Sequence, residues 1–258
     1  MSQCYAHHLG DCNGTLEDEH FFSRALQRML GPVDLAGLPW LRGSVKKLPP
    51  GSYLHSSLLC RKHHDDLDGI DRVALAYFQN LMLILGGGHI GKGTPGSIDQ
   101  VVGVIDGRRL EKWFLKLICG VVASGSFEID SAVQTRWVEA LFGRVGWPEE
   151  WALYITQGTR TLEKADASMH LEFHWTATGG LNGLIATAFA IEHLFALMPP
   201  DVLSPLAMRH PRRVGFRITR PGNADILKGA PHGTDVSFEI QWPEHHTRAT
   251  STRPMWPL

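Results

Sequence analysis

The residues whose types and spacing could support chemistry are concentrated near the start of the chain. Six of the fourteen histidines and three of the four cysteines fall within the first 64 residues. In a reducing compartment, cysteines spaced closely with histidines indicate metal binding rather than disulfide bonds. The clustering therefore predicts a metal site in the N-terminal part of the chain.

The spacing of these residues fits a zinc ion. Cys60 and His63 form a Cys-x2-His sequence, and Cys4 and Cys12 lie upstream as a second pair. Zinc takes four thiolate or imidazole ligands in a tetrahedron, commonly supplied as two pairs from separate segments. We therefore predict a structural zinc bound by Cys4, Cys12, Cys60 and His63.

One ligand has alternatives. His7 or His8 could replace Cys12, because Cys4 and His7 also form a Cys-x2-His spacing. Two arguments favour Cys12: a thiolate binds zinc more tightly, and the sequence Asp-Cys-Asn-Gly over 11–14 is typical of a turn. Residues 1–72 are rich in turn formers and bury little apolar surface, so a zinc ion worth roughly 10–16 kcal/mol would help to hold them together.

A second set of residues follows the same segment. Glu19 and His20 precede an apolar stretch, and His55 lies five residues before Cys60 in a Leu-Cys-Arg-Lys-His-His sequence that ends at His64. In this order and spacing, residues 4–64 resemble the HNH endonucleases of the ββα-metal (His-Me finger) family. The resemblance covers only this segment of the chain.

The resemblance implies a role for each matching residue. His20 would be the general base that activates water, and Glu19 and His64 would bind one catalytic divalent ion, Mg²⁺ or another metal. His55 would shape the loop that orients the site. A neutral histidine accepts a proton near pH 7, and a metal beside a phosphate stabilises charge on the leaving oxygen. The implied activity is hydrolysis of phosphodiester bonds in nucleic acid, with DNA favoured over RNA.

Three features depart from the family pattern. Ser23 stands where the family usually has proline, three residues after the catalytic histidine, and His55 stands where asparagine is common. The segment between His20 and His55 is longer than usual and contains a predicted helix over 24–30.

Charge is informative only locally. The formal net charge of −1 does not by itself predict a polyanionic partner. Between Leu35 and His64, however, there is no Asp or Glu, and five cationic side chains are present: Arg42, Lys46, Lys47, Arg61 and Lys62. Such a segment favours contact with phosphates, although a solvated basic loop explains the two adjacent lysines equally well.

The rest of the chain predicts an α+β fold. Apolar residues at helical spacing predict helices over 70–85, 108–122, 130–141 and 181–198, and alternating residues predict strands over 170–178, 214–218 and 236–240. Cys119 lies on the apolar side of its helix and is predicted to be a core residue. We expect an N-terminal zinc-stabilised ββα-metal module over 1–72 and a larger α+β domain of unknown role over 73–258.

The most apolar segment, 181–198, suits a buried helix better than a membrane span, because four polar residues interrupt it. It contains another acid-His pair, Glu192 and His193, but no Cys-x2-His sequence follows it. With no secretory signal at the start of the sequence, the chain is expected to be cytoplasmic and to have no membrane partner.

Two other functions fit the same residues. A non-catalytic zinc module that binds nucleic acid or protein would need the zinc ligands alone. A metal-dependent hydrolase acting on another substrate would need the second metal but not the basic segment.

Overall fold

The computed structural model describes ten segments of the chain: 4–20, 22–49, 55–85, 99–126, 130–157, 168–176, 180–189, 191–198, 208–217 and 235–243. At several of these positions only the backbone is described. Among them are three of the predicted site residues, Glu19, His20 and His55.

The N-terminal part contains two paired strands followed by a helix. After a 3₁₀ turn η1 (His7–Leu9), strand β1 (Leu16–His20) pairs antiparallel with β4 (His55–Cys60). Helix α2 (Arg61–Leu85) begins at the residue after β4 and packs against both strands. Between the two strands the chain forms α1 (Arg24–Leu30), β2 (Val33–Ala36), η2 (Pro39–Leu41) and β3 (Lys46–Leu48).

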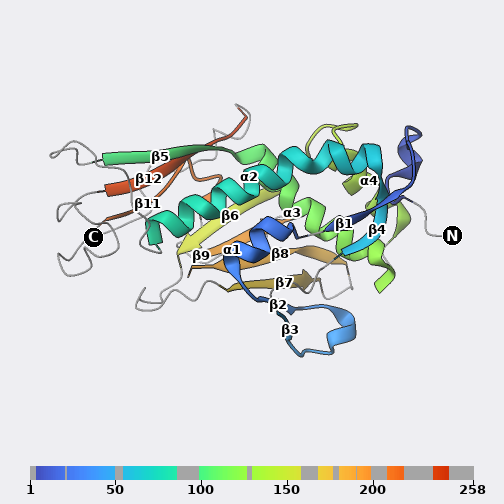
Figure 1. Ribbon diagram of the computed structural model, residues 1–258, viewed down its shortest axis with the longest axis horizontal. Coiled ribbons are helices and arrows are strands. Elements are labelled where there is room, and N and C mark those ends of the chain that lie inside the picture. The colour runs from blue at the N-terminus through green and yellow to red at the C-terminus, as the bar shows by residue number, and fades with distance from the viewer. Residues whose placement is uncertain are drawn as a thin grey trace.

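A seven-stranded sheet forms the centre of the molecule (Figure 1). Its order is β10-β6-β9-β8-β7-β2-β3, and it contains β6 (Ala152–Gln157), β7 (Met169–Trp175), β8 (Leu181–Ala188), β9 (Ile191–Ala196) and β10 (Met208–Arg209). Alternate residues of β7 are buried, as expected for a strand with one face on the core. The N-terminal strand β2 pairs parallel with β7.

Helices cover one face of this sheet. Helix α3 (Gly107–Val121) packs against α2, β9 and α4 (Ser131–Leu141), and it continues into a short π-helical turn, η3 (Val122–Ser126). The Asp106 and Asp130 side chains cap α3 and α4, accepting hydrogen bonds from the N–H groups of Arg109 and Ala132. A smaller sheet, in the order β11-β12-β5, contains β5 (Asp99–Asp106), β11 (Arg213–Arg217) and β12 (Asp235–Gln241) (Figure 1).

Most sequence-based elements are confirmed, but the helix predicted over 181–198 is wrong. This segment forms the antiparallel strands β8 and β9, joined at Phe189, whose φ is 52°. A buried apolar run has the same composition in a helix and in a central strand, so periodicity alone does not separate them. Helix α2 also begins nine residues before the predicted position at 70, directly after the strand pair.

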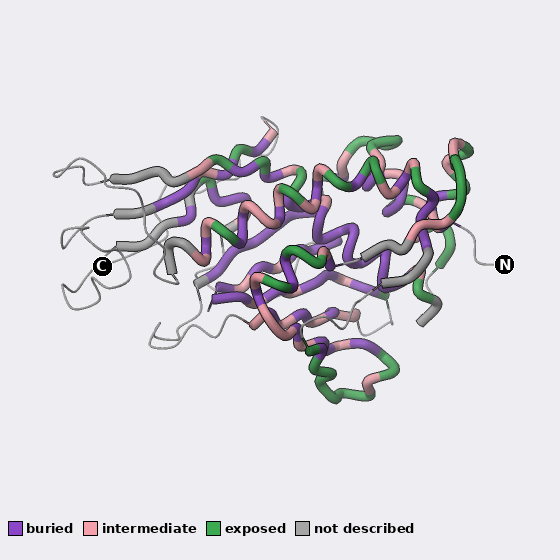
Figure 2. The backbone as a smooth tube through the Cα atoms, viewed as in Figure 1, coloured by how far each residue is buried: buried purple, intermediate pink, exposed green. Residues whose placement is uncertain are grey.

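The boundary predicted between residues 72 and 73 falls within α2, which runs from Arg61 to Leu85. Buried residues on both sides of it, from Cys4 to Trp242, belong to the same hydrophobic core. Figure 2 shows this buried interior running through the sheet and α3. Within the described part of the chain, none of the helices combines the length and apolar character that crossing a membrane requires.

Candidate metal centre

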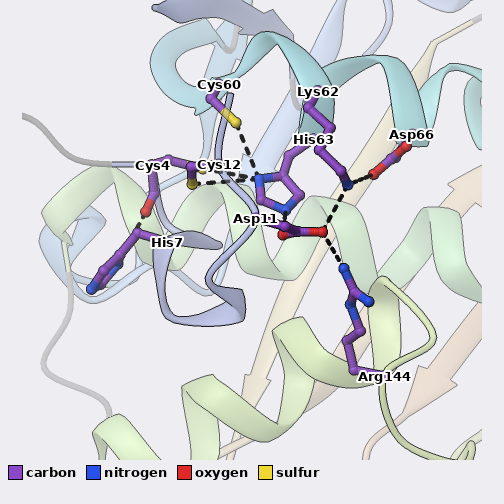
Figure 3. A network of polar contacts seen from close by, with 9 residues as sticks. All are labelled: Cys4, His7, Asp11, Cys12, Cys60, Lys62, His63, Asp66 and Arg144. Carbon is purple, nitrogen blue, oxygen red and sulfur yellow. Dashed lines mark hydrogen bonds and ion pairs between the residues drawn. The ribbon is translucent and has the colours of Figure 1, made fainter. Parts of the chain in front are cut away.

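Four of the predicted metal ligands converge on one point. The ligand atoms of Cys4, Cys12, Cys60 and His63 all lie within 4.8 Å of one another, and these side chains could bind a metal ion such as zinc. Cys60 is the last residue of β4 and His63 lies in the first turn of α2, so the strand-to-helix junction fixes one pair (Figure 3).

The other pair comes from the loop at 4–15, which is attached at one end to β4 and at the other to the first residue of α2. The Tyr5 N–H donates to the Leu58 carbonyl at 2.9 Å, and the Arg61 N–H donates to the Thr15 carbonyl at 3.3 Å. These two hydrogen bonds hold the loop beside the junction, where Cys4 and Cys12 meet Cys60 and His63.

The spacing of the four atoms suits tetrahedral zinc. His63 Nδ1 lies 3.2 Å from the sulfur of Cys60, 3.5 Å from that of Cys4 and 3.7 Å from that of Cys12. With Zn–S bonds of about 2.3 Å and Zn–N bonds of about 2.0 Å, the edges between sulfur and nitrogen in a tetrahedron are about 3.5 Å. The observed distances bracket that value.

The second nitrogen of the His63 ring fixes its orientation. His63 Nε2 lies 2.9 Å from Asp11 Oδ1. An ionised carboxylate only accepts hydrogen bonds, so Nε2 carries the proton and the Nδ1 lone pair faces the three sulfurs. Metal-bound histidines commonly have such a carboxylate partner, which raises the basicity of the bound nitrogen. The Phe142 ring packs edge-on against His63 at a centroid distance of 4.8 Å.

Asp11 is itself held by two cations. Its Oδ2 atom lies 3.0 Å from Lys62 Nζ and also pairs with the guanidinium of Arg144, which follows α4 (Figure 3). The hydrogen bond from Lys62, together with the nearby Arg144 charge, lowers the pKa of Asp11. Lys62 also pairs with Asp66 at 2.7 Å. Its ammonium is therefore engaged by two carboxylates beside the metal ligands.

The pKa values of the three thiols are shifted in different directions. Burial raises the pKa of Cys4, and burial together with the neighbouring thiols raises the pKa of Cys12 to about 12. Burial also acts to raise the pKa of Cys60, but hydrogen bonds from the N–H groups of His63 and Asn13 outweigh it and leave the pKa lowered. Burial lowers the pKa of His63, which favours the neutral, metal-binding imidazole.

The alternative ligands His7 and His8 are both exposed. His7 Nδ1 donates to the carbonyl oxygen of Cys4 at 3.2 Å, and neither histidine belongs to the group of converging ligand atoms. Among the described residues, the structure therefore brings Cys12 to the cluster and leaves His7 and His8 outside it.

The two neighbouring histidines of α2 face different surroundings. His63 has no exposed surface, whereas 41% of the His64 side chain is exposed. His64 Nδ1 lies 3.5 Å from Asp65 Oδ1. Consecutive helical residues project about 100° apart, which explains why only one of them reaches the cysteines.

The remaining predicted site residues are described by their backbone. In the β1–β4 pair His20 lies opposite His55 and Glu19 lies opposite Ser56, at the end of the pair away from Cys60. The register shifts between Glu17 and Glu19, as in a β-bulge. The side chains of Glu19, His20 and His55 lie outside the described residues.

Three residues of the site were not predicted: Asp11, Phe142 and Arg144. Asp11 was noted only as part of a turn, although a carboxylate next to a metal-ligand cysteine is a usable signal for a histidine partner. Phe142 and Arg144 have no local signal, because they reach the site through the packing of α4.

Comparison of this chain with models of known protein families, with curated proteins and with solved structures gives no match.

Proposed function

We propose that this chain is a metal-dependent endonuclease of the HNH kind, hydrolysing phosphodiester bonds in DNA or RNA. The observation that carries the proposal is the course of the backbone through β1, β4 and α2. It aligns His20 with His55 at one end of a strand pair and leads through Cys60 into the helix that bears His63 and His64. Two strands followed by a helix, in that order, are the elements of a ββα-metal module.

In this proposal the ion bound by Cys4, Cys12, Cys60 and His63 is a structural zinc. Four protein ligands leave no open position, which is typical of structural rather than catalytic zinc sites. Three thiolates and Zn²⁺ carry one net negative charge, and Asp11 adds another. Lys62 and Arg144 offset part of this negative charge, and Lys62 also pairs with Asp66.

The catalytic roles would belong to Glu19, His20 and His55 at the end of the strand pair away from Cys60, together with His64 in the first turn of α2. Glu19 and His64 would bind a divalent ion such as Mg²⁺, which stabilises negative charge on a phosphate and its leaving oxygen. His20 would take the proton from the attacking water, and His55 would orient the loop beside it. Because neutral His20 is required, cleavage should increase as the pH rises through roughly 6–7.

A nicking assay on supercoiled plasmid, with Mg²⁺ and separately with Mn²⁺, tests the activity. His20→Ala should reduce the rate on the order of 10²-fold or more while zinc content is unchanged. His170→Ala, at a partly exposed histidine on β7, is the matched control and should cut at the wild-type rate. A chain that binds zinc and nucleic acid but never cuts with either ion would exclude the nuclease and favour a non-catalytic binding module.

A further inference from the structure

The segment 37–47, which comprises the loop after β2 and the first two residues of β3, stands out from the body of the molecule (Figure 2). It is exposed along most of its length and contains Arg42, Lys46 and Lys47 but no acidic residue. It also carries Trp40, whose exposed fraction of 43% is unusual for so large an apolar side chain among the described residues. We call this segment the basic loop.

The local backbone explains why Trp40 faces outward. Residues 39–41 form the 3₁₀ turn η2, in which side chains three positions apart lie on the same side. Leu38 is 3% exposed and Leu41 packs against the core, so these two anchor the turn. Trp40 lies between them in sequence and is directed away from the core.

The basic loop is held in place by its own contacts. The Ser44 hydroxyl and the Ser44 N–H both donate to the Leu41 carbonyl, at 2.5 and 2.8 Å. At the base of the loop, Trp175 Nε1 donates to the Gly37 carbonyl at 2.5 Å. A Cβ atom at Gly37 would lie 2.0 Å from the Phe173 carbonyl oxygen, so only glycine allows this close approach to β7.

We propose that the basic loop binds single-stranded nucleic acid, with an unpaired base stacked on the indole of Trp40 and with Arg42, Lys46 and Lys47 on the phosphates. Proteins bind unpaired strands by combining cationic side chains with partly exposed aromatic rings, because every base offers a face for stacking. Bases inside a duplex are already stacked on each other and are not available to Trp40. An ordered loop also binds with a smaller entropic cost than one that must be fixed on binding.

The inference rests on the proposed function for its biological substrate, and the chain connects the two sites. Residues 21–54 leave the strand pair at His20 and return at His55, opposite His20. The seven residue-to-residue steps from Leu48 to His55 span at most about 25 Å, so the base of the loop lies within reach of an oligonucleotide that also reaches His20. An unpaired strand held by the loop could therefore extend to the proposed catalytic end.

Fluorescence anisotropy with a labelled DNA strand of about 20 nucleotides, and with the duplex of the same sequence, tests the stacking. Trp40→Leu, which keeps an apolar side chain but removes the ring, should weaken single-strand binding about tenfold and leave duplex binding nearly unchanged. Trp40→Phe should retain most of the affinity. Equal single-strand affinity for wild type and Trp40→Leu would overturn the proposal, as would an equal loss on both substrates.

The cations are tested by salt dependence. Lys46→Gln with Lys47→Gln should reduce the slope of log Kd against log salt by about 1.4 on the single strand. Arg72→Gln with Arg136→Gln, at exposed cations on α2 and α4, removes the same charge and should leave the slope unchanged.

Lysines on an edge strand such as β3 also prevent strands of different molecules from pairing. If the lysine variant only self-associates, with unchanged binding, the proposal fails.

The result of the binding test can be distinguished from the result of the nuclease test. His20→Ala should bind the single strand like wild type. Trp40-dependent binding without cleavage by any variant would exclude the nuclease and keep the basic loop as a binding site. Plasmid cleavage by wild type, with Trp40→Leu binding the single strand unchanged, would keep the nuclease and exclude this role for the loop.

Discussion

His63 and His193 are both completely buried, and in both the pKa is lowered by burial. Their hydrogen bonds are opposite. His63 donates from Nε2 to Asp11, so its Nδ1 lone pair is directed at the sulfurs of three thiols. His193 donates from Nδ1 to the Ala186 carbonyl at 2.9 Å and accepts at Nε2 from the Tyr77 hydroxyl at 2.7 Å. Its lone pair is therefore already used.

The residues that surround the two histidines also differ. Around His193 lie the aromatic rings of Tyr77, Phe78 and Phe114, within an apolar core built from helices and the central sheet. Around His63 lie two thiols from the loop at 4–15, one thiol from the end of β4 and the ring of Phe142. Burial of a histidine thus indicates nothing about metal binding until the partner of each ring nitrogen is known.

The largest effect should come from removing a sulfur at the metal centre. Cys60→Ser should abolish tight binding of zinc, expected at about one ion per chain, and lower the melting temperature by on the order of 10 °C, because zinc contributes several kcal/mol to folding. Cys119→Ser is the matched control: this buried thiol lies in α3, outside the ligand group, so its loss should cost stability but leave the metal content unchanged. Metal analysis with thermal denaturation measures both, and full zinc content in Cys60→Ser would contradict the ligand assignment.

Acid should destabilise the core through His193. Burial lowers its pKa from 6.5 to about 4 in the folded chain. Between these values the unfolded chain binds a proton that the folded chain does not, so stability is full above pH 6.5 and decreases as the pH falls towards 4. The decrease is roughly 3 kcal/mol for this group alone.

His193→Gln isolates that contribution, because it removes the titrating ring. Denaturant unfolding at several pH values should show a weaker pH dependence in the variant than in wild type. Acid also protonates the thiols at the metal centre, but it does so in both proteins, so the difference between them reports His193. Parallel curves for the two proteins would show that His193 does not titrate as its burial implies.

Asp11→Asn should have a smaller effect, confined to the metal. The amide can keep a hydrogen bond to His63 Nε2 but lacks the negative charge that makes the imidazole more basic and that pairs with Lys62 and Arg144. We expect a 10–100-fold loss in zinc affinity, which competition with a chromogenic chelator would measure. Asp66→Asn is the control, since it removes another partner of Lys62 without touching His63. The same affinity in both variants would show that the charge on Asp11 is unimportant.

The features that the sequence could predict come from neighbouring residues, and those that it could not predict depend on packing between distant segments. The four converging ligands were predictable because two come from a short Cys-x2-His sequence and the others from one nearby loop. Arg144 was not, because it meets Asp11 across 133 residues through the packing of α4. The strongly amphipathic helix α3 was predictable from its pattern, whereas β8 and β9 are buried apolar strands that look like a helix in sequence.

The smallest effect is expected at His64, the neighbour of the metal ligand. Its side chain is 41% exposed, so His64→Ala should change the melting temperature by no more than about 2 °C and leave the zinc content unchanged, while His63→Ala should lower both. If Glu19 and His64 bind the catalytic ion, His64→Ala should nevertheless remove plasmid nicking. Thermal denaturation, metal analysis and the nicking assay on the two variants therefore separate the structural from the catalytic metal. Equal melting temperatures for the two alanine variants would contradict the division between these adjacent histidines, because only His63 has its ring among the three sulfurs.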